Sequence, residues 1–250
     1  DDDDDDTARP KSRPFVIIGG GFEAGSRNFS YAIPSAINDA PNIRPYQAPF
    51  VPLLRIVAQV YPLAGASSPF LSGWGFVGDF AKAASVTSEN MADMQKLETA
   101  WTEWSARLRF QYVLSDFTLG VEGGLGGQSF SFTTSGGAGT LIDEVPGVDY
   151  KFIRLGGSAG MQVTPEISAR IGFHNKTVSG MGTLVDKFEQ TAVSGFGGEL
   201  AADYQLMPAL RLQLLLNLGR YSQVFQIRQD AQVGGTDQFV GAMLGAAYVR

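Results

Sequence analysis

The sequence predicts an all-β protein: a ten-stranded antiparallel β-barrel that spans a membrane. Apolar and polar residues alternate in ten separate segments, and the connections between them alternate between short and long. No apolar run reaches the length of about eighteen residues that a membrane helix needs. The composition agrees, because 44% of the 250 residues are hydrophobic while the mean hydropathy is -0.00. Alternating membrane strands give such an average, since half of their side chains face the lumen.

The chain divides into a leader, residues 1–12, and a barrel, residues 13–250. The leader starts with six aspartates, whose like charges repel and which bury nothing apolar, so it is predicted to be a disordered linker. The net charge of -6 equals this run, which leaves the body near neutral. A chain without a basic face is not expected to bind nucleic acid.

The ten segments are justified by the two-residue period of a strand. In the fourth, Trp104, Leu108 and Tyr112 alternate with Glu103 and Arg107, which a helix would not separate in this way. In the ninth, leucine occupies every second position over about nine residues, the length of a tilted membrane strand. In chain order, the apolar faces cover residues 16–24, 54–60, 74–80, 104–114, 117–125, 153–163, 167–173, 196–206, 210–218 and 240–248.

The connections are of two kinds. Tight turns rich in proline, serine or aspartate are predicted at 62–69, 115–116, 164–166 and 207–209. Long loops rich in Ser, Thr, Asn, Gly and Asp are predicted at 28–49, 83–100, 131–149, 177–193 and 222–236, with a short helix expected within 83–100. Short turns are periplasmic and long loops extracellular in outer-membrane barrels, and an even strand number returns both termini to the periplasm.

The polar faces carry acids and bases in nearly equal number. Ten strands leave a narrow lumen, where charges must be paired. A selective pore would show one dominant sign, so these residues are predicted to form Arg–carboxylate pairs that fill the barrel. The predicted lumen network consists of Glu23, Arg55, Asp79, Glu103, Arg107, Arg109, Glu122, Arg154, Arg170, Lys176, Glu199, Asp203 and Arg211.

Aromatic residues cluster near the short-turn ends of the segments. A lipid-facing girdle is expected there, at the membrane–water interface. The girdle is predicted to consist of Tyr61, Tyr112, Phe117, Tyr204 and Tyr248. The alternative is a soluble sandwich or lipocalin-like barrel with its apolar face inward, but the opposite face, rich in Gly, Arg and Glu, would coat a soluble protein poorly.

With these segments, turns and aromatics, the chain resembles the bacterial outer-membrane β-barrel class and its small, outer-membrane protein A-like members, over nearly all of residues 13–250. Such barrels usually end in a strand with a glycine, an aromatic residue and a terminal aromatic. Gly245 and Tyr248 match this pattern, whereas Arg250 stands at the last aromatic position. The resemblance implies the bacterial outer membrane, contact with lipid and lipopolysaccharide, and periplasmic or envelope protein partners.

Residues for catalysis or metal binding are scarce. The omptin proteases are also ten-stranded barrels, with acid pairs and a histidine at the outer rim. Here the single histidine, His174, has no acid beside it in sequence, and Lys176 rather than a serine occupies the next inward position. One histidine and no cysteine also argue against a transition-metal site. We therefore expect neither an enzyme nor a cofactor.

Three functions fit these features. The first is a side-chain-filled barrel that anchors or scaffolds a larger envelope assembly, with the acidic leader as a linker. The second is a narrow pore for ions or small solutes, and the third is surface recognition through the long loops. The balanced charges of the predicted lumen favour the first.

Overall fold

The computed structural model describes residues 13–32, 45–84, 86–90, 95–134, 147–182, 190–228 and 231–250. Its strands are β1 (Val16–Ala32), β2 (Tyr46–Val60), β3 (Trp74–Ala83), β4 (Val86–Asn90), β5 (Gln95–Leu114), β6 (Phe117–Thr134), β7 (Val148–Gln162), β8 (Ile167–Gly180), β9 (Gln190–Met207), β10 (Leu210–Arg228) and β11 (Ala231–Val249). A single short helix, α1 (Pro69–Ser72), appears in this part of the chain, and no described helix is long and apolar enough to cross a membrane.

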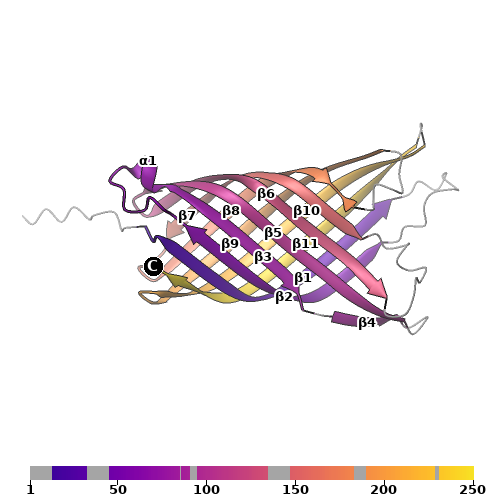
Figure 1. Ribbon diagram of the computed structural model, residues 1–250, viewed down its shortest axis with the longest axis horizontal. Coiled ribbons are helices and arrows are strands. Elements are labelled where there is room, and N and C mark those ends of the chain that lie inside the picture. The colour runs from indigo at the N-terminus through magenta and orange to yellow at the C-terminus, as the bar shows by residue number, and fades with distance from the viewer. Residues whose placement is uncertain are drawn as a thin grey trace, which may run out of the picture.

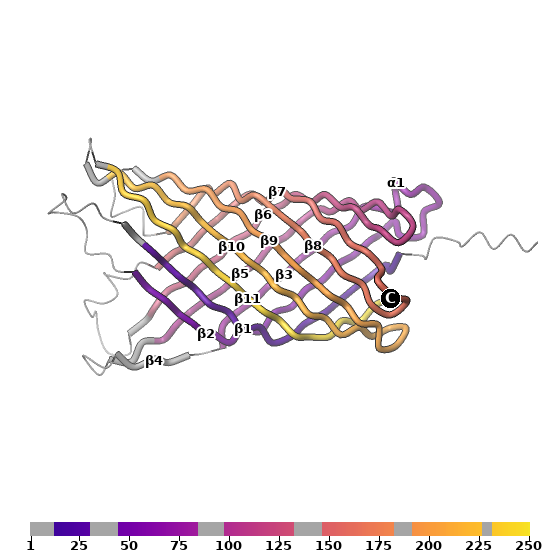
Figure 2. Tube along the Cα trace, turned by 180° about the vertical axis from the view of Figure 1, so that it is seen from behind, coloured from indigo at the N-terminus to yellow at the C-terminus, as the bar shows by residue number. Residues whose placement is uncertain are grey.

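The strands form one closed antiparallel sheet (Figures 1 and 2). Successive strands pair with one another, and β1 pairs with β11 to close the barrel, with Ile17 opposite Val249. β3 and β4 both pair with β5, one after the other, so that they share one position around the barrel. The described strands therefore make the ten positions that the sequence predicts, and the predicted fold class is confirmed.

The two ends of the barrel differ. At one end the strands are joined by tight turns, among them Ser115-Asp116, where Ser115 has a positive φ of 53°. α1 and the C-terminus lie at this same end (Figure 1), where the backbones of Val16 and Arg250 form two hydrogen bonds of 2.9 Å. We call this the short-turn end, and the opposite one the long-loop end.

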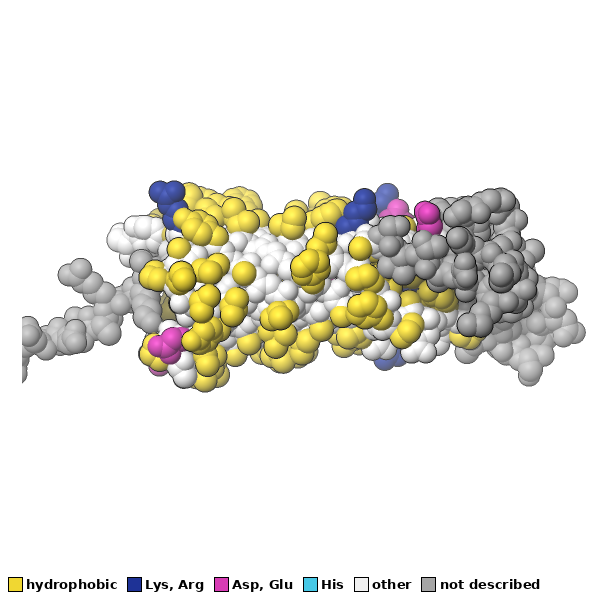
Figure 3. Space-filling model, turned by 90° about the horizontal axis from the view of Figure 1, so that it is seen from below, with side chains coloured by type: hydrophobic (Ala, Val, Ile, Leu, Met, Phe, Trp, Pro, Cys, Tyr) yellow, Lys and Arg dark blue, Asp and Glu magenta, His cyan; other side chains and the backbone are white. Residues whose placement is uncertain are grey.

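The outer surface carries a broad apolar band next to the short-turn end. On β10, for example, Leu212 and Leu216 point outward, with 42% and 41% of their area exposed. Apolar side chains are scattered over the face of the cylinder that Figure 3 shows. An exposed apolar belt of this kind is stable only in contact with lipid, and closure leaves no unpaired strand edge in the bilayer.

The band ends well before the strands do. On β10 the outward positions after Leu218 begin with Arg220, and on β7 the outward position before Ile153 is Lys151. Lys82 takes the equivalent place on β3. A membrane strand needs about 9–11 residues, whereas β5 has 20 and β10 has 19. The long-loop half of the barrel therefore projects beyond the bilayer.

This projection corrects the predicted loops. The strands extend into 28–49, 131–149, 177–193 and 222–236, and the expected helix in 83–100 is wrong, because β4 and the start of β5 pair as strands there. The turn 62–69 is instead extended by α1. The acidic leader 1–12 and the centres of the predicted loops, including Pro34 and Pro41, lie outside the described residues.

Candidate functional site

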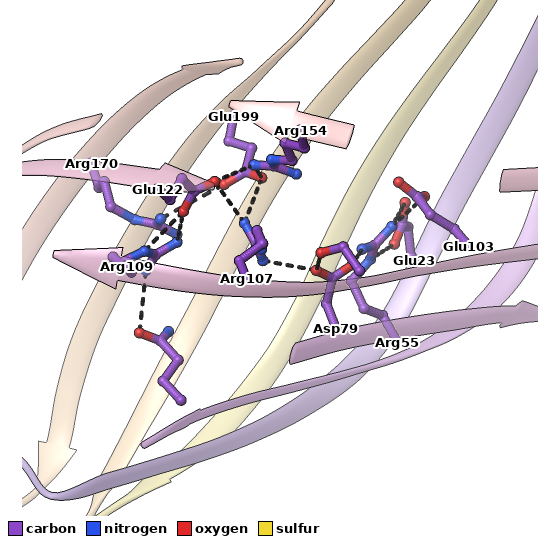
Figure 4. Close-up of polar contacts among 12 residues, drawn as sticks. Glu23, Arg55, Asp79, Glu103, Arg107, Arg109, Glu122, Arg154, Arg170 and Glu199 are labelled. Atoms are coloured by element: carbon purple, nitrogen blue, oxygen red, sulfur yellow. Dashed lines mark hydrogen bonds and ion pairs between the residues drawn. The ribbon is translucent and has the colours of Figure 1, made fainter. Parts of the chain in front are cut away.

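One ion-pair network crosses the lumen at the level of the apolar band (Figure 4). Its members point inward from eight strands, β1–β3 and β5–β9, as the two-residue alternation requires. It contains ten of the thirteen residues predicted for the lumen: Glu23, Arg55, Asp79, Glu103, Arg107, Arg109, Glu122, Arg154, Arg170 and Glu199.

Arg55 is the centre of the acid-rich part of this network. Its guanidinium donates to Glu23, and it lies 3.2 Å from Asp79 Oδ1 and 2.8 Å from Glu103 Oε2. Asn217 Nδ2 also donates to Glu23 Oε1, at 2.9 Å. A Cβ at Gly241 would lie 1.9 Å from that same oxygen, so only glycine leaves room for the Glu23 carboxylate. Three carboxylates thus surround one buried cation.

Glu122 is the centre of the base-rich part. Its carboxylate pairs with Arg107 at 3.0 Å, with Arg109 at 2.6 Å and with Arg154 at 2.8 Å. Arg107 also reaches Asp79 Oδ2 at 2.8 Å and so joins the two parts. Guanidinium groups suit this role, because their planar array of donors serves two carboxylates at once.

Glu199 extends the base-rich part along the barrel. Arg154 Nη2 donates to its Oε1 at 2.6 Å, while Arg107 and Arg170 each approach the carboxylate to only 3.7 Å. Every carboxylate of the network is therefore paired, but the arginines differ in how closely a carboxylate approaches them. Removing one partner from such a confined network is costly, because the remaining charge stays buried.

The other three predicted lumen residues lie outside the network. Lys176 Nζ donates to the Tyr221 hydroxyl at 3.0 Å and lies over the rings of Phe152 and Tyr221. Asp203 accepts from Gln213 Nε2 at 2.8 Å, and Arg211 Nε donates to Gln205 Oε1 at 2.6 Å. The structure thus places all three inside the barrel without an ion pair among the described residues.

An aromatic plug fills the long-loop half of the lumen. We use this name for a cluster of buried inward side chains that the lumen prediction did not contain. Tyr150 and Tyr221 stack with their ring centroids 3.9 Å apart, and Trp101 packs edge-on against Phe130 and Phe239. The plug comprises Ala48, Val51, Leu53, Ala81, Trp101, Phe130, Val148, Tyr150, Phe152, Met181, Tyr221, Phe225 and Phe239. Most of these residues are less than 5% exposed, so side chains close this half.

A buried ion pair lies within the plug. Arg27 and Asp237 form two hydrogen bonds of 2.9 Å, and both side chains are 0% exposed. Tyr150 donates a third hydrogen bond to Asp237 Oδ2 at 2.9 Å. The Arg27 guanidinium also lies over the rings of Phe130 and Phe239, at 4.4 and 5.5 Å from their centroids. The pair therefore fixes β1 and β11 to the centre of the plug.

The sequence does contain a signal for the plug. Beyond the apolar band the alternation continues, but it is inverted: on β1, Ser26 and Asn28 point outward while Arg27 and Phe29 are buried. β10 repeats this inversion, with Tyr221 and Phe225 inward. A segment that is polar outside and aromatic inside is typical of a soluble barrel, so the projecting half packs its core inward as a water-soluble protein does.

The predicted aromatic girdle needs one correction. Tyr112, Phe117, Tyr204 and Tyr248 are exposed on the outside, but Tyr61 is only 2% exposed and lies in the lumen. It follows Gln59 in the inward phase, and its hydroxyl donates to Gln111 Oε1 at 2.9 Å. Gly75 makes the space, because a Cβ there would lie 2.5 Å from the Tyr61 ring.

A cavity of about 820 Å³ occupies the lumen between the short turns and the plug. Arg13, Ser115 and Asp116 line it at the short-turn end. Gln128 and Phe239 line it at the other end, where the plug begins. The charged network forms much of its wall. The lumen is therefore hollow from the short-turn end, past the network, to the plug, and it is filled beyond that point.

His174 also lines this cavity, on β8. It is 8% exposed, and its Nδ1 has no hydrogen-bond partner. No carboxylate or hydroxyl of the described chain is hydrogen-bonded to it, and no cluster of metal-ligating side chains occurs among the residues that the structure describes. The imidazole thus lacks the oriented partner that a histidine-assisted nucleophile needs.

Comparisons with known proteins identify the fold. No family model and no curated protein matches the sequence. The outer membrane protease OmpT from Escherichia coli superposes with a TM-score of 0.54 at 8% identity, over 94% of this chain and 96% of that one. The fold is that of a bacterial outer-membrane β-barrel. The outer membrane protein OprG from Pseudomonas aeruginosa also matches, with a TM-score of 0.38 at 12% identity, over 96% and 97%. The barrel fold and the exposed apolar band together place the chain in the bacterial outer membrane.

Proposed function

We propose that this barrel is a closed outer-membrane anchor, which holds or scaffolds part of a larger envelope assembly. The observation that carries the proposal is the aromatic plug. Close-packed aromatic side chains around a fully buried Arg27–Asp237 pair exclude water and ions from the long-loop half. With the short turns assigned to the periplasm, the cavity faces the periplasm, and the leader 1–12 serves as the linker toward an envelope partner.

Exterior charges support contact with the outer leaflet. Lys82, Lys151 and Arg220 are exposed at the first outward positions beyond the apolar band, on three strands spread around the barrel. Long basic side chains at this depth reach the headgroup layer. We propose that they contact lipid and lipopolysaccharide phosphates.

The second candidate is a narrow pore, which the cavity of about 820 Å³ favours. It already leads from the short-turn end past the charged network, so only the plug separates the two ends. Surface recognition through the long loops is a third candidate, which depends on residues outside the described ranges. A catalytic role is not proposed, given the isolated His174.

Conductance separates the anchor from the pore. In planar bilayers we expect the wild-type barrel to give no stable single-channel current. The double substitution Phe130→Ala and Tyr221→Ala removes two rings from the plug and should produce stable openings. Phe173→Ala, which removes a ring exposed to lipid, is the matched control and should stay closed. Stable wild-type current of the same size as the double variant would exclude the closed anchor in favour of the pore.

A further inference from the structure

We propose that the lumen cavity is a binding site for a small oxyanion, a phosphate- or carboxylate-bearing solute that enters from the short-turn end. The site is formed by Arg170 and Arg211, with Lys176 deeper in the same cavity. This binding function goes beyond the anchor and does not depend on it, because a barrel closed by its plug can have an empty or an occupied cavity.

The first argument is unused hydrogen-bond donors. Within the described part of the chain, the Arg170 guanidinium makes no hydrogen bond, and its one ion pair, to Glu199, is 3.7 Å long. Arg211 uses only Nε, which leaves both Nη groups free to bind a ligand. Lys176 uses one of its three donors, on Tyr221. All three residues line the cavity, so the unused donors belong to its wall.

The carboxylate acceptors in the cavity wall have closer partners than these donors have. Glu122 receives three arginines, Glu199 receives Arg154 at 2.6 Å, and Asp203 receives Gln213 at 2.8 Å. Donors that lack partners in a confined site call for a ligand that brings acceptors. An oxyanion brings several, and its oxygens fit the forked donor array of a guanidinium.

Charge separation along the lumen points the same way. Around Arg55 there are three carboxylates, which gives this part a local excess of two negative charges. The base-rich part holds four arginines, Arg107, Arg109, Arg154 and Arg170, against Glu122 and Glu199. In the same cavity wall, Arg211 adds a positive charge and Asp203 a negative one. A bound anion would offset the remaining positive excess. The acid-rich part contributes only one carboxylate to this purpose, that of Asp79, which pairs with Arg107.

The size and shape of the cavity fit a small solute. Its volume of about 820 Å³ lies within the usual range of roughly 300–1,000 Å³ for small-molecule sites. Apolar side chains such as Val77, Leu215 and Met243 complete its wall. A ligand with one anionic group and a modest apolar body would therefore fill it.

Calorimetry with inorganic phosphate as the probe tests the site. The full chain, folded in zwitterionic detergent, is titrated at constant ionic strength and pH. We expect saturable binding of one phosphate per barrel, and Arg170→Gln or Arg211→Gln should weaken it at least tenfold. Arg250→Gln removes an exposed arginine that does not line the cavity and should leave the affinity unchanged, and choline, as a cationic probe, should not bind.

Two results would overturn the proposal. One is no saturable phosphate binding by the wild-type barrel, and the other is wild-type affinity in both lumen variants. Arg211 makes no ion pair among the described residues, so Arg211→Gln keeps the test decisive if Arg170→Gln fails to fold. If phosphate does not bind and the wild-type barrel gives no stable current, the oxyanion site is excluded and the proposal of a closed anchor is retained.

Discussion

Asp237→Ala is expected to lower the free energy of unfolding of the barrel by about 3–5 kcal/mol. The substitution leaves Arg27 as an unpaired cation that is 0% exposed, and it also removes the acceptor of the Tyr150 hydroxyl. Urea titration in detergent, followed by tryptophan fluorescence, measures the loss. Trp101 lies in the plug and reports on this half of the barrel directly.

The controls separate a lost charge pair from a lost side chain. Asp149→Ala breaks an exposed 3.9 Å contact to Lys151 in the same projecting half, so it should cost less than about 1 kcal/mol. The double substitution Arg27→Met and Asp237→Leu removes both charges and should recover most of the stability. Equal losses for Asp149→Ala and Asp237→Ala would contradict the buried pair.

Leu108→Arg is expected to cost roughly 2–4 kcal/mol, because its side chain lies in the middle of the apolar band. Leu108 points outward from β5 and is 44% exposed. An arginine there meets hydrocarbon, and only its length allows the charge to reach toward the interface. Folding titrations into lipid vesicles give the free-energy difference.

The matched control lies six residues away on the same strand and the same outward phase. Thr102 sits beyond the band, so Thr102→Arg should cost only about 0–1 kcal/mol. Similar free-energy costs at both positions would mean that the apolar band extends past the point where the outward residues of β5 become polar. The projecting half of the barrel would then have to be placed inside the bilayer.

The barrel itself could be predicted because membrane strands obey one simple rule. An apolar outer face such as Leu212 to Leu218 requires lipid, and the opposite face then has to be the lumen. That same rule placed Glu23, Arg55 and Arg107 inward. Partner choice could not be predicted, because it depends on the shear between strands, which brings Arg55 of β2 to Glu103 of β5.

The plug could not be predicted by a rule that searches for outward apolar residues. Around Phe29 and Tyr221 the outward residues are polar, so these stretches look like loops although the alternation continues. Tyr61 illustrates a conflict of a different kind. Its place near a short turn suggested the girdle, but its phase relative to Gln59 determined where the ring points. Phase is a stronger guide than position along the strand.

Cysteine labelling tests the central claim most directly, namely that the lumen opens at one end only. The chain has no cysteine, so single substitutions give unambiguous signals. Ser158→Cys lies in the cavity wall, Ser115→Cys marks the short-turn end, and Gln232→Cys marks the long-loop end. Each variant is placed in vesicles with the same procedure and exposed to a hydrophilic, membrane-impermeant maleimide.

The labelled fraction at Ser115 reports the barrels whose short turns face outward, and that at Gln232 reports the opposite orientation. The closed lumen predicts that Ser158→Cys is labelled to the same fraction as Ser115→Cys. Complete labelling of Ser158→Cys in both orientations would contradict it, because the reagent would then have passed the plug.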